Sequence, residues 1–349
     1  MEKLKLGIVG CGGMEKTHES GVKELENIEV VCTADIIKER AEIAAHVHGA
    51  KYAYTDYRHM MDKIDAVLLV TPHQLHYAMG KDFLLAGKHV LMEKPFCNTE
   101  GQCLELARLA EERNLTIMTA YCMRFHPMVI KLKELVDAKT YGETFQISIW
   151  TEQHTQFPTD SWASNAATLG GGQLFSHGCH YIDLLLWFLG NPVRGSHIGS
   201  NYCTEWMDME GTSNVSIKFE NGAIGYHFGT WGAKGSRLKY SIHAHCTGGM
   251  LEAALSESKL YLHQWGKEPE VLFEYAQGKH TQYEIAHFFD CIKTGKKPQT
   301  DIGSSLQGLR VIWRMYNAER NDRVADLRGL GFEQPWKFVS EDPGDRRGF

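Results

Sequence analysis

Residues 4–13 read Leu-Lys-Leu-Gly-Ile-Val-Gly-Cys-Gly-Gly, an apolar run that breaks into glycines and predicts a buried strand followed by a tight turn. Gly10 and Gly12 occupy the first two positions of the Gly-x-Gly-x-x-Gly turn that binds dinucleotides. Gly10 permits the sharp turn, and Gly12 lets backbone N–H groups approach a pyrophosphate at the helix N-terminus. The third position is Glu15, so the fingerprint is incomplete, and an ordinary glycine-rich turn is the alternative.

A second apolar run, from Ile28 to Ala34, ends in Asp35, 25 residues after Gly10. An acid about 20 residues after the turn accepts hydrogen bonds from the adenosine ribose hydroxyls. The carboxylate of Asp35 would also repel a 2′-phosphate, so the sequence favours NAD over NADP. Asp35 can alternatively cap the helix that follows it, and both roles can hold at once.

The length and composition indicate a globular protein of two domains. The chain has 349 residues, of which 43% are hydrophobic and 23% charged. The net charge of −6 offers no basic face, and no apolar run approaches the ~20 residues that a membrane span needs. We therefore expect no nucleic-acid partner and no membrane partner.

The first residues and the cysteines favour a cytoplasmic protein. Met1-Glu2-Lys3 leads directly into the first strand, which argues against a signal peptide. Nine cysteines are scattered singly, without a Cys-x-x-Cys pair. This pattern favours reduced thiols and argues against structural zinc, and we assign the chain no metal.

The hydrophobic pattern divides the chain into residues 1–122 and residues 123–349. Strands and helices alternate in the first part, which predicts a Rossmann domain with a doubly wound parallel sheet. Its expected strands are Leu4–Val9, Glu29–Ala34, Ala66–Val70, His89–Met92 and Thr116–Thr119, and its expected helices include Tyr77–Leu85 and Thr99–Arg113.

The second part alternates apolar and polar residues, which predicts an α/β domain with a mainly antiparallel sheet. Its expected strands are Phe145–Thr151, Thr212–Phe219, Ala223–Gly229, Leu238–His245 and Lys259–His263, and its expected helices are Tyr283–Thr294 and Ser304–Arg320. Asn221-Gly222 predicts a hairpin, and we expect the charged tail 341–349 to lack regular structure.

Two polar segments directly follow strands of the first sheet. Thr71-Pro72 and His76 come after one strand, and Glu93-Lys94-Pro95 comes after the next. Ligands of open parallel sheets lie beyond the carboxyl ends of the strands, so we expect both segments beside the cofactor. A lysine there can hold a substrate hydroxyl or act as an acid or a base. The alternatives are a simple helix start and a solvated strand end.

Residues 170–183 read Gly-Gly-Gly-Gln-Leu-Phe-Ser-His-Gly-Cys-His-Tyr-Ile-Asp. His177, His180 and Asp183 recur at i, i+3 and i+6, roughly one face of a helix. Three polar groups beside an apolar helix would be unfavourable unless they met a ligand or each other. One such histidine alone could be a satisfied core residue, but the trio favours a functional site.

These motifs together resemble the Gfo/Idh/MocA family of glucose-fructose oxidoreductase and inositol dehydrogenase relatives over nearly the whole chain. The segments that carry the resemblance are, in order, Gly10-Cys11-Gly12-Gly13-Met14, Asp35, Thr71-Pro72, Ala86-Gly87-Lys88-His89-Val90, Glu93-Lys94-Pro95, Arg124-Phe125-His126-Pro127, Gly170-Gly171-Gly172, His180 and Asp183. The resemblance implies hydride transfer between a nicotinamide and a sugar or cyclitol carbon, with Lys94 and His180 at the reacting hydroxyl. It also implies an open sheet that is commonly an oligomer interface, so we expect a homo-oligomer.

The motifs and the resemblance give three sets of expected site residues. The expected NAD-binding residues are Gly10, Gly12, Gly13, Met14, Asp35, Thr71, Pro72, His76, Glu93, Lys94 and Trp162. The expected substrate-binding residues are Lys94, Tyr121, Arg124, His126, His177, His180 and Asp183. The expected catalytic residues are Lys94, His177 and His180.

The chain departs from the family pattern at three positions. Ser176 stands where dehydrogenase members usually carry an aspartate, so His177 is a candidate for the missing general base. Ala163 follows Trp162 where the family often has an arginine. Glu15 puts a carboxylate near the pyrophosphate, which should weaken dinucleotide binding unless the side chain is turned away or hydrogen-bonded.

Three functions remain open at this point. The first is an NAD-dependent oxidoreductase that acts on a sugar or cyclitol hydroxyl. The second is a glycoside hydrolase with retained NAD, which works by transient ring oxidation, elimination, hydration and re-reduction, because a ring ketone acidifies the neighbouring C–H. The surplus of candidate acid–base groups, including His126 and His154, favours this second function, although both histidines could simply face solvent. The third is a non-catalytic NAD-binding protein.

Overall fold

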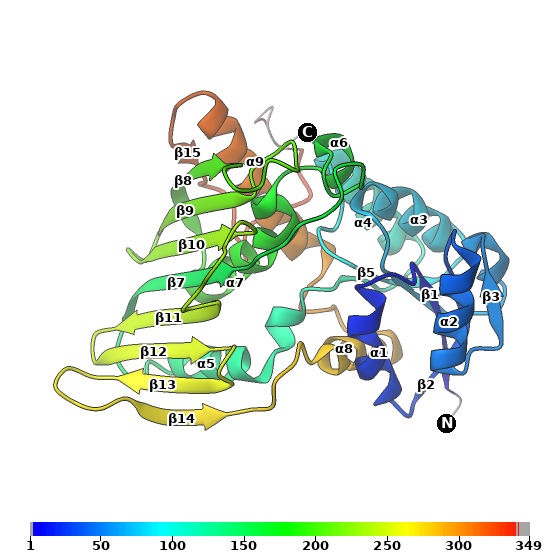
Figure 1. Ribbon diagram of the computed structural model, residues 1–349, viewed down its shortest axis with the longest axis horizontal. Coiled ribbons are helices and arrows are strands. Elements are labelled where there is room, and N and C mark those ends of the chain that lie inside the picture. The colour runs from blue at the N-terminus through cyan, green and yellow to red at the C-terminus, as the bar shows by residue number, and fades with distance from the viewer. Residues whose placement is uncertain (1–2, 340, 342–349) are drawn as a thin grey trace. The chain divides into compact units, whose positions relative to one another are not determined.

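The computed structural model describes residues 3–339 and 341, which form two compact units, each built on one sheet (Figure 1). The first unit comprises residues 3–97, 101–125 and 279–302, and the second comprises 98–100, 126–278 and the residues from 303 onward. The predicted α/β class is confirmed. The domain division between residues 122 and 123 stays a prediction. By contacts within the chain, residues 279–302 also belong to the first unit.

The sheet of the first unit is parallel, and its strand order is β3-β2-β1-β4-β5-β6. Its strands are β1 (Leu4–Val9), β2 (Ile28–Ala34), β3 (Tyr52–Tyr54), β4 (Ala66–Leu69), β5 (His89–Met92) and β6 (Ile117–Thr119). The order reverses between β1 and β4, and such a switch point is where open α/β sheets bind ligands. The segments after Val9 and Leu69 therefore flank this position.

Helices follow the strands of the first unit as the alternating pattern predicts. They are α1 (Glu15–Lys23), α2 (Lys38–His48), α3 (His73–Leu85), α4 (Glu100–Glu112) and α8 (Thr281–Thr294), with 3₁₀ turns η1 (Tyr57–Met60) and η2 (Cys122–Phe125). Helix α8 comes from far along the chain and packs on α1 and η2. It contributes Ile285, Phe288 and Phe289 to the same buried core as Leu6 and Ile8.

The sheet of the second unit is mixed but mainly antiparallel, in the order β14-β13-β12-β11-β7-β10-β9-β8-β15. Its strands are β7 (Thr144–Glu152), β8 (Pro192–Ser200), β9 (Thr212–Phe219), β10 (Ile224–Thr230), β11 (Tyr240–Cys246), β12 (Gly249–Ala254), β13 (Lys259–His263), β14 (Glu270–Glu274) and β15 (Ala325–Asp326). Only the β7–β10 pair is parallel among these strands of the described chain. Strands β9 and β10 form the predicted hairpin, with Gly222 at a φ of +89°.

Helices cover one face of this sheet. The second unit contains α5 (Pro127–Asp137), α6 (Ala166–Leu169), a π-helical turn η3 (Leu174–Gly178), α7 (Cys179–Leu189) and α9 (Ile302–Arg320). Helix α7 contacts β10, and α5 contacts β12, β13 and β14 (Figure 1). Val215, Ile217 and Phe219 of β9 are buried, whereas alternate residues of the strand face outward.

Two further observations concern the remainder of the chain. No helix among the described residues is long and apolar enough to cross a membrane. The expectation for the tail 341–349 lies outside the described residues, apart from Glu341.

Candidate functional site

The glycine turn after β1 is shaped as the sequence predicts. Gly10 has a φ of +91°, and a Cβ at this position would lie 2.3 Å from the carbonyl oxygen of Val70, so only glycine fits. A Cβ on Gly12 or Gly13 would meet no atom of residues 3–339 or 341 within 4 Å. The turn therefore packs tightly against the sheet at Gly10 and leaves space for a ligand at Gly12 and Gly13.

Helix α1 begins directly after this turn. Its N-cap is Met14, and no side chain from the described residues caps its first N–H groups. Such uncapped N–H groups form a site for a phosphate. Glu15 is turned away into a buried contact, because its Oε1 lies 2.6 Å from Nε2 of His48 at the end of α2. The departure at the third fingerprint position thus becomes a link between two helices.

Asp35 lies beside the turn. Its Oδ2 accepts the N–H of Cys11 at 2.9 Å, and its Oδ1 accepts the N–H of Ile37 at 2.9 Å. The carboxylate therefore fixes the glycine turn and keeps lone pairs for hydroxyl donors. The alternative of a helix cap is wrong, because Ile37 is the N-cap of α2 and no described side chain caps that helix.

The segment after β4 adds a polar group on the other side of the turn. The Thr71 hydroxyl is buried and has no hydrogen-bond partner in the described part of the chain. Its Cγ2 would lie 3.1 Å from a Cβ on Gly10. An unsatisfied buried hydroxyl beside an open glycine turn fits a polar ligand such as NAD. Pro72 follows as the N-cap of α3.

His76 connects two loops of this edge. Its Nδ1 lies 2.9 Å from the carbonyl oxygen of Pro95, and its Nε2 lies 2.9 Å from that of Thr71. Burial lowers the pKa of His76, and the hydrogen bonds to these two carbonyls oppose this shift. Both nitrogens thus face protein atoms, and the cofactor contact predicted for His76 stays a prediction.

Glu93 and Lys94 follow β5. Glu93 is buried, and its Oε1 accepts a hydrogen bond from Nε2 of His18 at 2.7 Å. Its Oε2 accepts the N–H of Lys94 at 3.1 Å. A carboxylate at the end of a buried strand is thus satisfied, and it fixes the backbone of the half-buried lysine.

Three predicted substrate residues lie where the chain passes from the first unit to the second. Tyr121 and Arg124 are buried in the first unit, where the N–H of Arg124 donates to the carbonyl of Tyr121 at 3.0 Å. His126 belongs to the second unit and caps α5, because its Nδ1 accepts the N–H of Met128 at 3.2 Å. Capping is a role that the sequence did not indicate for His126.

The second unit carries the histidine cluster on two kinds of helix. Ser176 and His177 lie in the π-helical turn η3, and His180 and Asp183 lie in α7. Single π turns inside helices are frequent at functional sites. His180 and Asp183 lie in the α-helix that the spacing predicts, whereas His177 lies in the wider π-helical turn before it. The rings of His177 and His180 lie 6.2 Å apart, edge to face.

Aromatic rings surround these histidines. Tyr181 and Tyr240 present their rings 5.3 Å and 6.0 Å from the ring of His177, whose Nδ1 lies 3.3 Å from Nε2 of Gln173. Tyr181 stacks on His227 at 5.1 Å. Burial lowers the pKa of His227 to about 3, so this ring is a neutral support.

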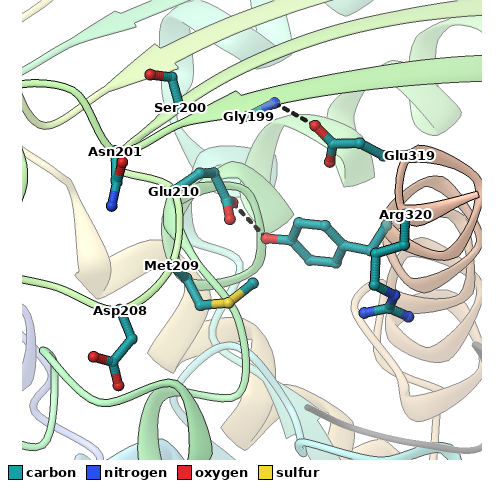
Figure 2. A pocket seen from close by; sticks show the side chains of 9 residues that line it. Gly199, Ser200, Asn201, Asp208, Met209, Glu210, Glu319 and Arg320 are labelled. Atoms are coloured by element: carbon teal, nitrogen blue, oxygen red, sulfur yellow. Dashed lines mark hydrogen bonds between the residues drawn. The ribbon is translucent and has the colours of Figure 1, made fainter. Parts of the chain in front are cut away.

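A buried acid–phenol pair anchors the glycine segment that leads into the π turn. Tyr316 Oη accepts the N–H groups of Gly172 (3.1 Å) and Phe175 (3.3 Å) and donates to Oε1 of Glu210 (2.5 Å). Burial raises the pKa of both side chains. Figure 2 shows Glu210 on the wall of a pocket of about 530 Å³. The sequence missed this pair, because 106 residues separate its members.

Two other expected residues lie in loops of the second unit. Trp162 is 36% exposed, and its carbonyl accepts the Thr168 hydroxyl at 2.6 Å. His154 is exposed and pairs with Gly232 in an isolated bridge. Within residues 3–339 and 341, no group of three or more His, Cys, Asp or Glu side chains could hold a metal ion.

Comparison with known families matches both units. Residues 4–121 match the family described as "Oxidoreductase family, NAD-binding Rossmann fold", and residues 129–252 match the "GFO/IDH/MocA C-terminal domain". The chain belongs to the Gfo/Idh/MocA family. Its cofactor is NAD, and the open glycine turn, the uncapped helix and Asp35 fit that cofactor.

Several known proteins are similar to this chain over different lengths. An uncharacterized oxidoreductase, YrbE of Bacillus subtilis, is 24% identical over 64% of this chain and 66% of its own length, just under two thirds. The scyllo-inositol 2-dehydrogenase (NAD(+)) of Bacillus subtilis is 23% identical over 93% of this chain and 96% of its own length. The D-xylose 1-dehydrogenase (NADP(+)) 2 of Haloferax volcanii is 23% identical over 93% of this chain and all of its own length.

Solved structures share the fold. Levoglucosan dehydrogenase in complex with NADH superposes with a TM-score of 0.85 at 19% identity, over 93% of this chain and 99% of that chain. The WlbA dehydrogenase from Bordetella pertussis, in complex with NADH and UDP-GlcNAcA, gives a TM-score of 0.77 at 21% identity, over 93% and 99% of the two chains.

Proposed function

We propose that this Gfo/Idh/MocA oxidoreductase oxidises a hydroxyl of a sugar or cyclitol with NAD. The observation that carries the proposal is the fixed Lys94, whose N–H and preceding carboxylate are held at the carboxyl end of β5. Thr71 and the glycine turn lie at the same edge of the sheet, after β4 and β1. Inositol and xylose dehydrogenases among the relatives support a polyol substrate.

The residues have separate tasks in this reaction. Gly12, Gly13 and the start of α1 would hold the pyrophosphate, and Asp35 the adenosine ribose. Bound NAD would supply the hydride acceptor. Lys94 would hold the reacting hydroxyl, and His180 would accept its proton as the carbon gives up hydride.

The test is an assay of reduced nicotinamide absorbance. The purified protein is incubated with NAD and scyllo-inositol, D-xylose or levoglucosan, and in parallel with aryl glycosides. Steady formation of reduced cofactor with a free polyol supports the dehydrogenase. Aglycone release without net reduction would replace it by the NAD-retaining glycoside hydrolase, and no signal with either class would leave the non-catalytic NAD-binding protein.

The glycoside hydrolase is a second candidate because of the cluster around Ser176. His177 and His180 lie edge to face beside Tyr181, which offers more acid–base groups than hydride transfer needs. In such an enzyme a base removes the C–H proton beside the new ketone, and the aglycone leaves with its electron pair.

His177→Ala separates the two candidates. In a hydrolase, we expect aglycone release to be blocked while some bound NAD is still reduced on first mixing. In a dehydrogenase with His180 as the sole base, the change should be nearly silent in steady-state rates. Stopped-flow absorbance makes the measurement, and loss of the initial reduction as well would place His177 in the hydride step.

Asp35 should make the protein prefer NAD to NADP. Its carboxylate is fixed by Cys11 and Ile37 beside the turn, where a 2′-phosphate would meet its charge. We expect calorimetric titration to give at least about tenfold tighter binding of NAD, roughly 1.4 kcal/mol. Asp35→Asn should narrow this ratio, and equal affinity of the wild type for both cofactors would contradict the prediction.

A homo-oligomer is expected to form through the uncovered face of the second sheet. This face carries aromatic pairs, with Trp150 lying 5.3 Å from Tyr226 and 5.8 Å from Phe228 between ring centres. Exposed apolar side chains, among them Phe145 at 53%, extend the patch. Light scattering should give a mass above one chain at micromolar concentration, and Trp150→Lys should lower it. A monomeric wild type would contradict this expectation.

A further inference from the structure

Three buried ionisable groups form a line inside the first unit. Glu93 comes from the end of β5, His18 from α1 and Glu284 from α8. The Nε2 of His18 lies 2.7 Å from Oε1 of Glu93, and its Nδ1 lies 3.8 Å from Oε1 of Glu284. His18 and Glu284 are at most 1% exposed, and nothing in the proposed reaction uses them directly.

The outer carboxyl of the line has an unusual environment. Neither oxygen of Glu284 has a hydrogen-bond partner within residues 3–339 and 341. Burial and the negative charge of Glu93 raise the pKa of Glu284 well above its usual value, whereas the charge of Lys279 lowers it. Glu284 is therefore neutral over a wider pH range than an ordinary carboxyl.

The line ends on the backbone of Lys94. Glu93 accepts the N–H of Lys94 with its second oxygen, so His18 and the lysine backbone share one carboxylate. On the other side, the ring of His76 lies against the carbonyl of Pro95. Buried imidazoles therefore hold the residues before and after Lys94.

We propose that His18 and Glu284 are positioning residues for Lys94, acting through the carboxylate of Glu93. The inference rests on the proposed function, in which Lys94 holds the reacting hydroxyl. A lysine on a mobile turn would sample many positions, and misplacement by about 1 Å can lower a rate by about a hundredfold. His18 holds Glu93 in one orientation, and Glu284 packs on the far side of the imidazole, 3.8 Å from its Nδ1, where it limits how the ring can move.

The first test compares His18→Leu with His18→Gln. Leucine removes the donor to Glu93, and we expect kcat to fall by about tenfold to a hundredfold with little change in KM for NAD. Glutamine can donate from a similar position and should recover most of this loss. The matched control is His89→Leu, at the opposite end of β5, which removes a 2.9 Å contact with the N–H of Thr116 and should leave kcat unchanged.

A second readout needs no substrate. Competitive acylation with acetic anhydride, followed by peptide mass spectrometry, measures the reactivity of Lys94 relative to Lys88. The ratio should change in His18→Leu, return toward the wild-type ratio in His18→Gln and stay constant in His89→Leu. A constant ratio in every variant would overturn the inference, whether or not the protein unfolds more readily.

The third test uses pH and Glu284→Gln. A raised carboxyl pKa gives stability that is fully present below the unfolded-state pKa and is lost as the pH rises toward the folded value. The melting temperature of Glu284→Gln should therefore rise relative to that of the wild type as the pH increases above ~4.3, the pKa of an ordinary glutamate. Ionisation of Glu284 would place a second negative charge beside His18, so we expect kcat of the wild type to decline at alkaline pH and this decline to weaken in the variant. A gain in stability with an unchanged kcat profile would assign Glu284 a structural role only.

The proposed function of Lys94 and the positioning role of His18 can fail separately. If Lys94→Ala leaves turnover intact, the proposed function of Lys94 is wrong. If Lys94→Ala lowers turnover but His18→Leu does not, the positioning role alone is wrong.

Discussion

Lys94→Ala is expected to lower turnover by about a hundredfold or more while NAD still binds. The amine is the group that would hold the reacting hydroxyl, and alanine offers no replacement. The proposed pyrophosphate and ribose contacts lie on Gly12, Gly13 and Asp35, none of which depends on the lysine side chain. Calorimetric titration of NAD and the rate of cofactor reduction measure the two effects independently.

The control for this experiment is Lys88→Ala. Lys88 lies immediately before β5, at the other end of the strand from Lys94, and carries the same charge. Its loss should leave both binding and turnover near wild type. If both lysine variants reduce turnover alike, a general electrostatic effect of the strand explains the data better than contact with substrate.

Gly12→Val is expected to abolish NAD binding in a folded protein. The open space around a Cβ on Gly12 shows that the described chain itself can accept a side chain there. That space is where a pyrophosphate would approach the backbone, so valine would exclude the cofactor. Circular dichroism and a melting curve should match the wild type, and titration should show no binding heat.

Substitutions at two further glycines separate an effect on NAD binding from an effect on folding. Gly101→Val is the matched control, because a Cβ there also meets no described atom within 4 Å, but in α4. Gly10→Ala should instead impair folding, since its Cβ would meet the carbonyl of Val70 and its φ is +91°. Retained binding in Gly12→Val would mean that the turn does not cradle the cofactor.

The sequence predicts the elements whose signals are local. The apolar run into Gly10 fixes β1 and its turn, and Asn221-Gly222 fixes the β9–β10 hairpin. A run of apolar residues must be buried, and a turn needs particular backbone angles. Both requirements can be recognised from a few neighbouring residues.

The contacts that order the site are not local. His18 meets Glu93 across 75 residues, and its second neighbour, Glu284, lies in a helix from the far part of the chain. In the sequence, His18 is one polar residue on an amphipathic helix. Only burial shows that the imidazole must find partners, and burial depends on the packing of α8 against α1.

The π turn was also beyond sequence reasoning. The hydroxyl of Tyr316 accepts N–H groups of Gly172 and Phe175 at the start of this turn, and this partner lies more than 140 residues away along the chain. The spacing of His177 to His180 therefore suggested an α-helical face, whereas the structure reaches proximity by another geometry.

That wide turn makes the chemistry sensitive to the length of the chain. Each residue of an α-helix turns the side chain direction by about 100°. Loss of one codon between Leu174 and His177 would leave the spacing of His177 and His180 unchanged, but it would rotate Gln173 and Leu174 by about 100° relative to both histidines. In related genes, a single in-frame insertion or deletion here therefore changes which side chains face the histidines, and alignments should weigh gaps in this segment as heavily as changes of residue.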